Sequence, residues 1–435
     1  MVVMGGIIGS GIFINPFVVA RLVHAPAMIL GAWVAGGILA LIGAFIYAEL
    51  ADRMPRAGGQ YAYLREAYHP ALGFLFGWAE LFVIGAGGSA AVVVTFAKYF
   101  RELTQSSAPE NLIATIAVAL LILINCMGVR AGSGVQSLFM VLRIAGVALV
   151  VASGAWFITR PDAPPTSWHP LLDRPLSIGL LSVFGVTMIP VLFAYGGWQT
   201  SNFIASEIRE PQKNLPRALL LGVLGVIALY VSVNFIYVAA LTPAGLATTS
   251  TPASEVMRQA LGGAGARLIA VAIAISTIGF LSQAMLTFPR VYFAMAEDGV
   301  MPRAIARLSE RSRAPVVAIA LQGAVIIIVV LLGTFEQILS YVVVTDWLFF
   351  GLTASSVFVF RAREKKTKRA NHEATHRIPG HPYTTALFTA AAWLIVINTI
   401  YKYPRNSGVA MCILFAGVPV YVAFQRIARR GNGLK

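Results

Sequence analysis

Charged residues are scarce in this chain of 435 residues: Asp, Glu, Lys and Arg together make up 12% of it. Soluble domains contain about 25% charged residues, so a soluble enzyme and a disordered protein are both excluded. Cysteine is scarce too, since Cys126 and Cys412 are the only two and both lie in apolar runs. They cannot build the framework of a disulfide-rich secreted domain. Hydrophobic residues are abundant and make up 58% of the chain.

Twelve apolar runs account for this composition. A helix needs about 20 mostly apolar residues to cross the hydrocarbon core of a bilayer. The runs that meet this requirement span approximately residues 1–23, 27–50, 70–99, 111–128, 134–158, 178–203, 216–241, 264–296, 314–333, 337–360, 384–401 and 407–426. They leave no room for a separate soluble domain. The chain is therefore predicted to be an all-α integral membrane protein with twelve transmembrane helices.

The formal net charge of +15 follows this pattern. In a soluble chain such a charge would suggest nucleic acid. Here the basic residues lie between apolar runs, where their distribution sets membrane orientation. With a cytoplasmic N-terminus, 23 of the 33 Lys and Arg fall in cytoplasmic segments and 9 in outer segments. We expect a multi-pass protein of the cell (inner) membrane with both termini in the cytoplasm. Its expected partner is the lipid bilayer and not nucleic acid.

Two of the runs contain residues that disfavour a continuous helix. Residues 5–12 of the first run read GGIIGSGI, and residues 190–198 of the sixth read PVLFAYGGW. In a helix interior Gly costs about 1 kcal/mol and Pro about 3 kcal/mol. Close helix packing through small residues explains either cluster alone. Clusters that open two successive sets of five spans instead indicate an inverted-repeat transporter with its site near the membrane midplane.

An interrupted helix exposes main-chain groups that a small molecule can bind. A half-helix beginning near Ser10 and Gly11 presents unpaired N–H groups and a positive dipole end, which suit a carboxylate. Carbonyl groups left free at the end of the preceding half-helix and in the broken sixth span suit an ammonium. A site with both is suited to a zwitterion, so an amino acid is the expected ligand.

Four motifs in the same order resemble those of the amino acid–polyamine–organocation superfamily. Residues 9–13 (GSGIF) resemble its first-span signature, and residues 193–198 with the loop 207–217 resemble its sixth span and the loop that follows. Residues 55–66 resemble the loop after its second span, and residues 290–302 the end of its eighth. The similarity covers nearly the whole chain and is greatest to bacterial relatives of the L-type amino acid transporters.

This resemblance implies a LeuT-type fold of two inverted repeats, residues 1–158 and 178–361, followed by two peripheral spans in residues 384–428. It implies secondary transport by alternating access, with no enzymatic activity and no cofactor. Animal members that pair with a glycoprotein use a cysteine between the third and fourth spans. Residues 100–111 contain none, so no disulfide-linked heavy subunit is expected.

The resemblance also assigns a substrate site. By position, the amides of Ser10, Gly11 and Ile12 hold the carboxylate, and the carbonyls of Ile7, Phe193 and Gly196 hold the amino group. Phe193 also acts as an aromatic gate. The full predicted substrate site consists of Ile7, Gly9, Ser10, Gly11, Ile12, Phe193, Ala194, Tyr195, Gly196, Gly197 and Trp198.

Three charged residues, Glu80, Arg143 and Asp346, lie inside predicted spans, where a charge costs about 2.5–3.5 kcal/mol. Many relatives carry Lys at the position of Arg143, near the sodium site of sodium-coupled members, and Ser276 and Thr277 resemble the hydroxyl pair of that site. Arg, unlike Lys, does not release a proton. We therefore expect ion-independent exchange or facilitated transport. A structural link between the first, fifth and eighth spans fits the same position, and packing or pairing is the simpler role for Glu80 and Asp346.

A match to the zinc-protease pattern H-E-x-x-H occurs at residues 372–376. That pattern requires a helix, a third ligand and an enclosed cleft. Here it lies in a predicted loop directly after the basic run 361–369, and nearby cations repel Zn²⁺. No metal site is predicted.

The side chain of the substrate is less well defined. The uncharged break in the sixth span and the glycine-rich residues 85–89 favour neutral L-amino acids, whereas Glu80 keeps a cationic substrate open. The alternatives are a proton-coupled amino acid symporter and a cationic amino acid or polyamine antiporter. A membrane receptor or channel is the rival of a different class, but a channel would need a ring of like groups.

Overall fold

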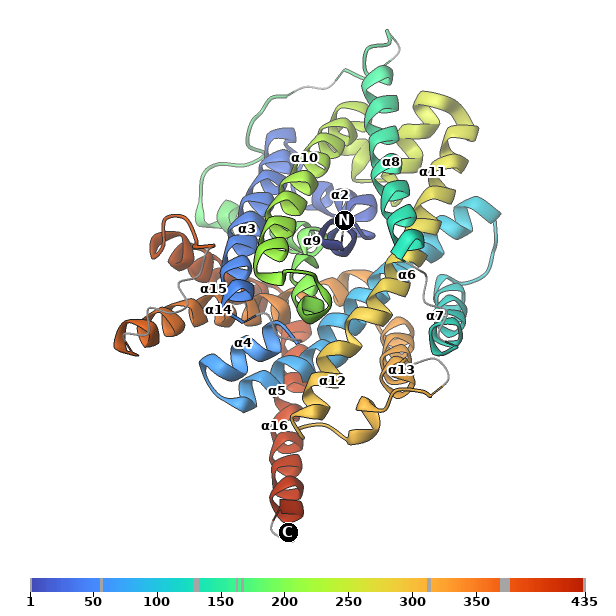
Figure 1. Cartoon of the computed structure of the whole chain (residues 1–435). Coiled ribbons are helices and arrows are strands. Elements are labelled where there is room, and N and C mark those ends of the chain that lie inside the picture. The colour runs from blue at the N-terminus through green and yellow to red at the C-terminus, as the bar shows by residue number, and fades with distance from the viewer. Residues whose placement is uncertain are drawn as a thin grey trace.

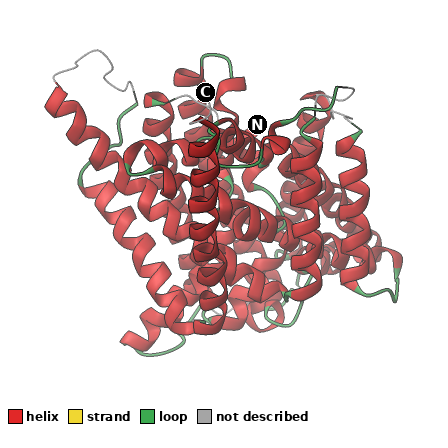
Figure 2. Cartoon of the chain, turned by 90° about the horizontal axis from the view of Figure 1, so that it is seen from below, coloured by secondary structure: helices red, strands yellow, loops and turns green. Residues whose placement is uncertain are grey.

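The computed structural model describes residues 2–54, 58–127, 133–161, 163–165, 168–310, 314–367 and 376–432. All regular structure in these ranges is helical (Figures 1 and 2). In chain order the elements are α1 (Val2–Ile7), α2 (Gly11–Leu22), α3 (Pro26–Arg53), α4 (Gln60–Ala67), α5 (Pro70–Ala79), η1 (Glu80–Ile84), α6 (Gly85–Thr104), α7 (Glu110–Cys126), α8 (Ser133–Phe157), α9 (Ile178–Tyr195), η2 (Trp198–Glu207), α10 (Pro211–Leu246), α11 (Pro252–Thr287), α12 (Pro289–Glu297), η3 (Arg303–Ala306), α13 (Val316–Leu332), α14 (Phe335–Thr367), α15 (Tyr383–Lys402) and α16 (Pro404–Asn432).

Nine helical segments among the described residues are long and apolar enough to cross a membrane. They are Pro26–Arg53, Pro70–Thr104, Leu138–Phe157, Ile178–Tyr195, Pro211–Leu246, Pro252–Glu297, Phe335–Lys365, Tyr383–Lys402 and Pro404–Arg426. Three shorter apolar helices, α2, α7 and α13, occupy the remaining predicted runs. The predicted all-helical architecture is confirmed. The predicted number of twelve transmembrane helices is reached only if these three shorter helices also cross the membrane.

The structure differs from the sequence prediction in two connections. Residues 60–67, expected as part of a loop, form the helix α4, which packs against α5 and α14. Five of its apolar residues are buried, but it is too short for a membrane span, so a search for long apolar runs misses it. The predicted eighth span is divided into α11 and α12 at Pro289, which has no N–H to donate to a continuous helix.

Both glycine clusters coincide with interruptions of the helical backbone. Helix α1 ends at Ile7 and α2 begins at Gly11, while α9 ends at Tyr195 and η2 begins at Trp198. The two interruptions lie together, since α2 packs on α9 and α1 packs on η2. In Figure 1 this crossing lies near the centre of the molecule, close to α3, α8, α10 and α11.

Glycine at Gly197 and Gly6 permits the close approach of the two broken helices. Gly197 has φ of +100°, in the region that favours glycine, and a Cβ built there would overlap the Gly6 carbonyl group. Conversely, a Cβ on Gly6 would lie 2.7 Å from the Gly197 carbonyl oxygen. The two main chains are therefore in direct contact, without side chains between them.

Replacing Gly197 with alanine is expected to destabilise the protein. A left-handed backbone costs about 1–2 kcal/mol once a Cβ is present, and the overlap with Gly6 adds to that cost. The melting temperature of the detergent-purified protein should fall by several degrees. Gly31→Ala is the matched control, because nothing lies within 4 Å of a Cβ placed on Gly31. Equal melting temperatures for the two variants would contradict the direct contact between the broken helices.

Candidate functional site

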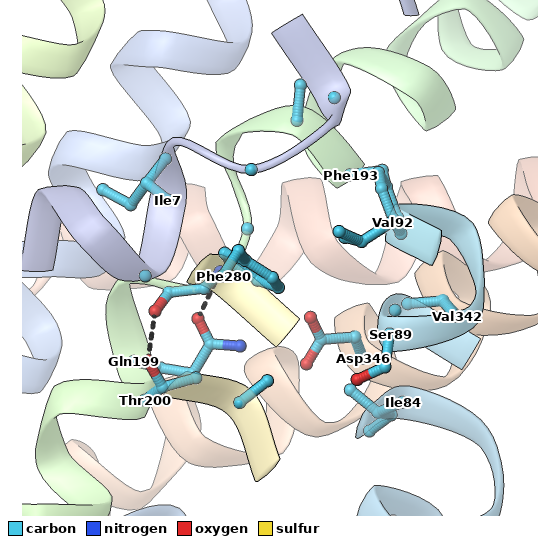
Figure 3. Close-up of a pocket in the computed structure, with 18 of the residues that line it drawn as sticks. Ile7, Ile84, Ser89, Val92, Phe193, Gln199, Thr200, Phe280, Val342 and Asp346 are labelled. Atoms are coloured by element: carbon cyan, nitrogen blue, oxygen red, sulfur yellow. Dashed lines mark hydrogen bonds between the residues drawn. The ribbon is translucent and has the colours of Figure 1, made fainter. Parts of the chain in front are cut away.

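A cavity of about 90 Å³ lies where the two interruptions face each other. Eight of the eleven predicted substrate-site residues line it: Ile7, Gly9, Ser10, Gly11, Phe193, Ala194, Gly196 and Gly197. Figure 3 shows Ile7 and Phe193 on opposite sides of this space. The structure therefore brings together residues that are about 190 positions apart in the sequence.

Ile12, Tyr195 and Trp198 do not line the cavity. The Tyr195 ring packs against Trp33 and Tyr230, with centroids 5.9 Å and 5.1 Å away. The Trp198 ring stacks on Phe350 at 5.1 Å. Ile12 is fully buried in the apolar core. The side chains of these three residues support the backbone of the site and do not face a ligand.

The beginning of α2 presents free donors to the cavity. Among the described residues, the main-chain amides of Ser10, Gly11 and Ile12 donate no hydrogen bond, whereas the next amide, of Phe13, donates to the Ser10 carbonyl at 3.0 Å. The Ser10 hydroxyl is buried and has no partner within the described part of the chain. These groups lie at the positive end of the α2 dipole, and together they form an arrangement suited to a carboxylate.

The predicted acceptors differ in their availability. The Ile7 carbonyl accepts hydrogen bonds from the Gly9 amide at 2.7 Å and from the Tyr230 hydroxyl at 3.1 Å. The Phe193 carbonyl accepts one from the Gly196 amide at 3.2 Å. The Gly196 carbonyl accepts none from the described residues. Of the three, Gly196 is therefore the acceptor most accessible to an ammonium group.

Side chains that the sequence analysis did not assign to the site form the rest of the wall. The apolar ones include Ile84, Val92, Phe280 and Val342 (Figure 3). The polar ones are Glu80, Ser89, Gln199, Thr200, Gln283, Thr287 and Asp346. Glu80 and Asp346 carried a signal in the sequence because they are charged inside apolar runs. The uncharged polar residues had no comparable signal.

Gln199 and Thr200 hold the backbone of the second break in place. The Gln199 side-chain oxygen accepts a hydrogen bond from the Gly197 amide at 3.0 Å, and the Thr200 hydroxyl donates to the Gly197 carbonyl at 2.7 Å (Figure 3). Both main-chain groups of Gly197 are thus satisfied locally. This leaves the Gly196 carbonyl as the exposed polar group of the break.

Arg143 lies behind the cavity wall and not in it. Its side chain is 2% exposed and donates to the carbonyl oxygens of Gly5 at 2.8 Å and Ile8 at 3.4 Å. The guanidinium also lies 5.8 Å from the centre of the Phe280 ring, which lines the cavity on its other side. A Cβ on Gly279 would be 3.2 Å from Arg143, so α11 leaves room for this side chain. Arg143 links α1, α8 and α11.

Ser276 and Thr277 are buried on α11, near the turn that packs on Arg143. The Thr277 hydroxyl donates to its own helix, at the carbonyls of Ile273 and Ala274, 2.9 Å away in each case. The Ser276 hydroxyl has no partner among the described residues. Arg143 makes its hydrogen bonds with α1 and makes none with this hydroxyl pair.

The zinc-like motif falls almost entirely on residues 372–375, outside the described residues. His376, its last member, is described, and its main-chain amide donates to Asp52 at 3.0 Å. Within the described ranges, no group of three or more His, Cys, Asp or Glu side chains is arranged to hold a metal ion.

Comparison with known proteins identifies the family. The profile described as "Amino acid permease" matches residues 1–427. The serine/threonine exchanger SteT of Bacillus subtilis is 32% identical over 432 residues, which cover 98% of this chain and 94% of that exchanger. The human large neutral amino acids transporter small subunit 2 is 28% identical, covering 97% and 78% of the two chains. The human b(0,+)-type amino acid transporter 1 is 31% identical, covering 85% and 76%. These relatives are transporters and not enzymes, and the chain belongs to the amino acid permease family of the amino acid–polyamine–organocation superfamily.

Proposed function

We propose that this protein exchanges or facilitates the movement of neutral L-amino acids across the cell membrane by alternating access. One observation carries the proposal: free main-chain donors at Ser10 and Gly11 and a free acceptor at Gly196 belong to residues that line the same cavity. A carboxylate and an ammonium on one carbon atom match this pair of groups. The site recognises what all amino acids share, so the rest of the cavity selects among side chains.

The architecture proposed for this function is a LeuT-type arrangement of twelve spans. Residues 1–158 form the first inverted repeat, residues 178–361 the second, and residues 384–428 the peripheral spans. The interruption at the first helix of each half supports this division, because binding sites of such transporters lie at paired discontinuous helices. The bias of Lys and Arg supports cytoplasmic termini.

The apolar part of the cavity supports neutral substrates. Ile84, Val92, Leu192, Phe280 and Val342 line it and offer no charge to a side chain. Two of the relatives are named for neutral substrates, serine and threonine in one case and large neutral amino acids in the other. We expect no disulfide-linked heavy subunit, because residues 100–111 contain no cysteine.

Ion-independent transport is supported by the position of Arg143. A fixed positive charge on the C-terminal carbonyls of α1 stabilises that half-helix without a bound ion. Lysine there could change its charge by releasing a proton, whereas arginine retains it. Transport should then be driven by the substrate gradients alone.

Main-chain recognition predicts that the α-carboxylate is essential for binding. In a thermal-shift screen, neutral L-amino acids should raise the melting temperature, while their decarboxylated amines at the same concentrations should not. A ligand at 100 times its Kd stabilises by about 2.7 kcal/mol, which such a screen detects readily. Leucine paired with 3-methylbutylamine is a suitable first comparison. Equal shifts for the members of each pair would refute recognition through the breaks.

Ion independence predicts no concentrative uptake of a neutral amino acid in proteoliposomes under an imposed proton or sodium gradient. Preloading the vesicles with unlabelled substrate should instead accelerate uptake of the labelled amino acid, because exchange returns the carrier in a loaded state. A channel would show no such acceleration, so the same measurement tests the rival class. Accumulation driven by either ion gradient would show that Arg143 does not replace the coupling ion.

A further inference from the structure

Two buried carboxylates face the cavity without a cationic partner. The side chains of Glu80 and Asp346 are 2% and 8% exposed, and both line the cavity. Neither accepts a hydrogen bond or forms an ion pair with any described residue, and Asp346 Oδ1 is fully enclosed without a partner. No Lys, Arg or His is present among the described residues that line the cavity. Arg143 is buried too, but its guanidinium donates to the carbonyls of Gly5 and Ile8.

Glu49 shows how this protein satisfies a buried carboxylate that lies outside the cavity. Glu49 is fully buried and accepts hydrogen bonds from Arg53 at 2.7 Å, from Arg361 at 2.6 Å and from the Ile378 amide at 2.9 Å. The packing or pairing role expected for Glu80 and Asp346 requires partners of this kind. Their absence in the described structure indicates that the partner comes from the cavity.

The backbone around Glu80 is specialised to present this side chain. Glu80 begins η1, a single π-helical turn, and its carbonyl accepts the Gly85 amide five residues later. Such turns are rare and occur frequently at functional sites. A Cβ on Gly85 would lie 2.9 Å from the Glu80 carboxylate, so glycine makes room for it. One turn further, the hydroxyl of Ser89 is 1% exposed, lines the same cavity and has no partner.

Asp346 reaches the same cavity from α14. In Figure 3 its carboxylate points away from α14 toward the space between the helices, and the amide end of Gln199 points toward it from η2. The Gln199 oxygen already accepts from Gly197, so its NH₂ group is the end available to the cavity. Both carboxylates line the same cavity as the two breaks, so an amino acid held at the breaks can direct its side chain toward them.

Electrostatics requires a neutralising group here. A buried, unpaired carboxylate is strongly unfavourable, and two that interact with each other are more so. The other titratable side chains that act on the pair are the phenols of Tyr47 on α3 and Tyr292 on α12, which supply no positive charge. A proton or a cationic ligand group can each remove the excess negative charge.

We propose that Glu80 and Asp346 form a side-chain subsite that is neutralised either by a proton or by the cationic end of a substrate. With the proton bound, the cavity accepts neutral amino acids. When an ammonium or guanidinium side chain enters, it replaces the proton, which leaves to the solvent. The protein therefore takes dibasic amino acids as well as neutral ones, in a ratio set by pH. This inference rests on the proposed function, because the α-amino and α-carboxylate groups are held at the breaks.

Arginine and citrulline provide the test, because they have nearly the same shape and differ in the charge of the side chain. Their α-groups titrate alike, so the ratio of their affinities isolates the side-chain subsite. In the purified protein, calorimetry should show this ratio shifting toward arginine by at least about tenfold between about pH 5.5 and pH 8.5. Titration in buffers of different ionisation enthalpy should show that arginine binding releases a proton and citrulline binding does not.

Variants assign the effect to the pair. In Glu80→Gln/Asp346→Asn the affinity ratio should vary less than about twofold over the same pH range, and arginine should lose its proton release. Glu297→Gln, at an exposed carboxylate on α12, should behave like the wild type. If the double variant does not fold, two other measurements test the inference. They are proton release when arginine binds to the wild type, and the pH dependence of the arginine-to-citrulline affinity ratio in the single variant Asp346→Asn.

The outcomes separate this inference from the proposed function. If citrulline binds but its decarboxylated amine does not, and the arginine-to-citrulline ratio is constant with pH, the acidic subsite is wrong and main-chain recognition stands. If agmatine, the decarboxylated form of arginine, binds as well as arginine does, the proposed function itself fails. A pH-dependent ratio that persists in the double variant would assign the effect to other groups and overturn the inference.

Discussion

The contact between two interrupted helices is the constraint on which the rest of this structure depends. Within a bilayer, a non-helical backbone is tolerated only where it contacts protein or lines a polar cavity. Each unsatisfied main-chain group would otherwise cost roughly several kcal/mol. The absence of side chains at Gly6 and Gly197 lets the two main chains make direct contact. Many of the main-chain polar groups at the breaks are hydrogen-bonded by the side chains of Gln199, Thr200, Tyr230 and Arg143. The groups they leave unpaired define the site.

The charge distribution around α1 and the cavity is asymmetric in a way that suits a zwitterion. Arg143 lies against the C-terminal carbonyls of α1, where a cation opposes the negative end of the helix dipole. Phe280 separates this cation from the cavity, so it does not neutralise a ligand directly. The cavity therefore has a positive end at the α2 amides, which suits the carboxylate of a zwitterion, and a free carbonyl at Gly196, which suits its ammonium group.

Sequence reasoning predicted the parts of this arrangement that leave a local signal. Glycine clusters, charges inside apolar runs and the runs themselves can be read residue by residue, and the breaks lie where the glycines indicated. The orientation of side chains could not be predicted in the same way. Tyr195 belongs to α9, which is apolar on every side, so no amphipathic pattern distinguishes the face that packs from the face that meets the ligand. Ser89 and Gln199 were missed because an uncharged polar residue gives no signal comparable to a charge inside an apolar run.

The role of Arg143 follows from what a moving α1 requires. In alternating access the half-helices at the site change their packing, and the carbonyls of Gly5 and Ile8 move with α1. A lysine or a bound ion can leave those carbonyls by losing a proton or dissociating, but a guanidinium keeps its charge and must keep acceptors. Arg143 therefore either moves together with α1 or exchanges these carbonyls for others, and the unpaired Ser276 hydroxyl on α11 is an acceptor within the same buried region.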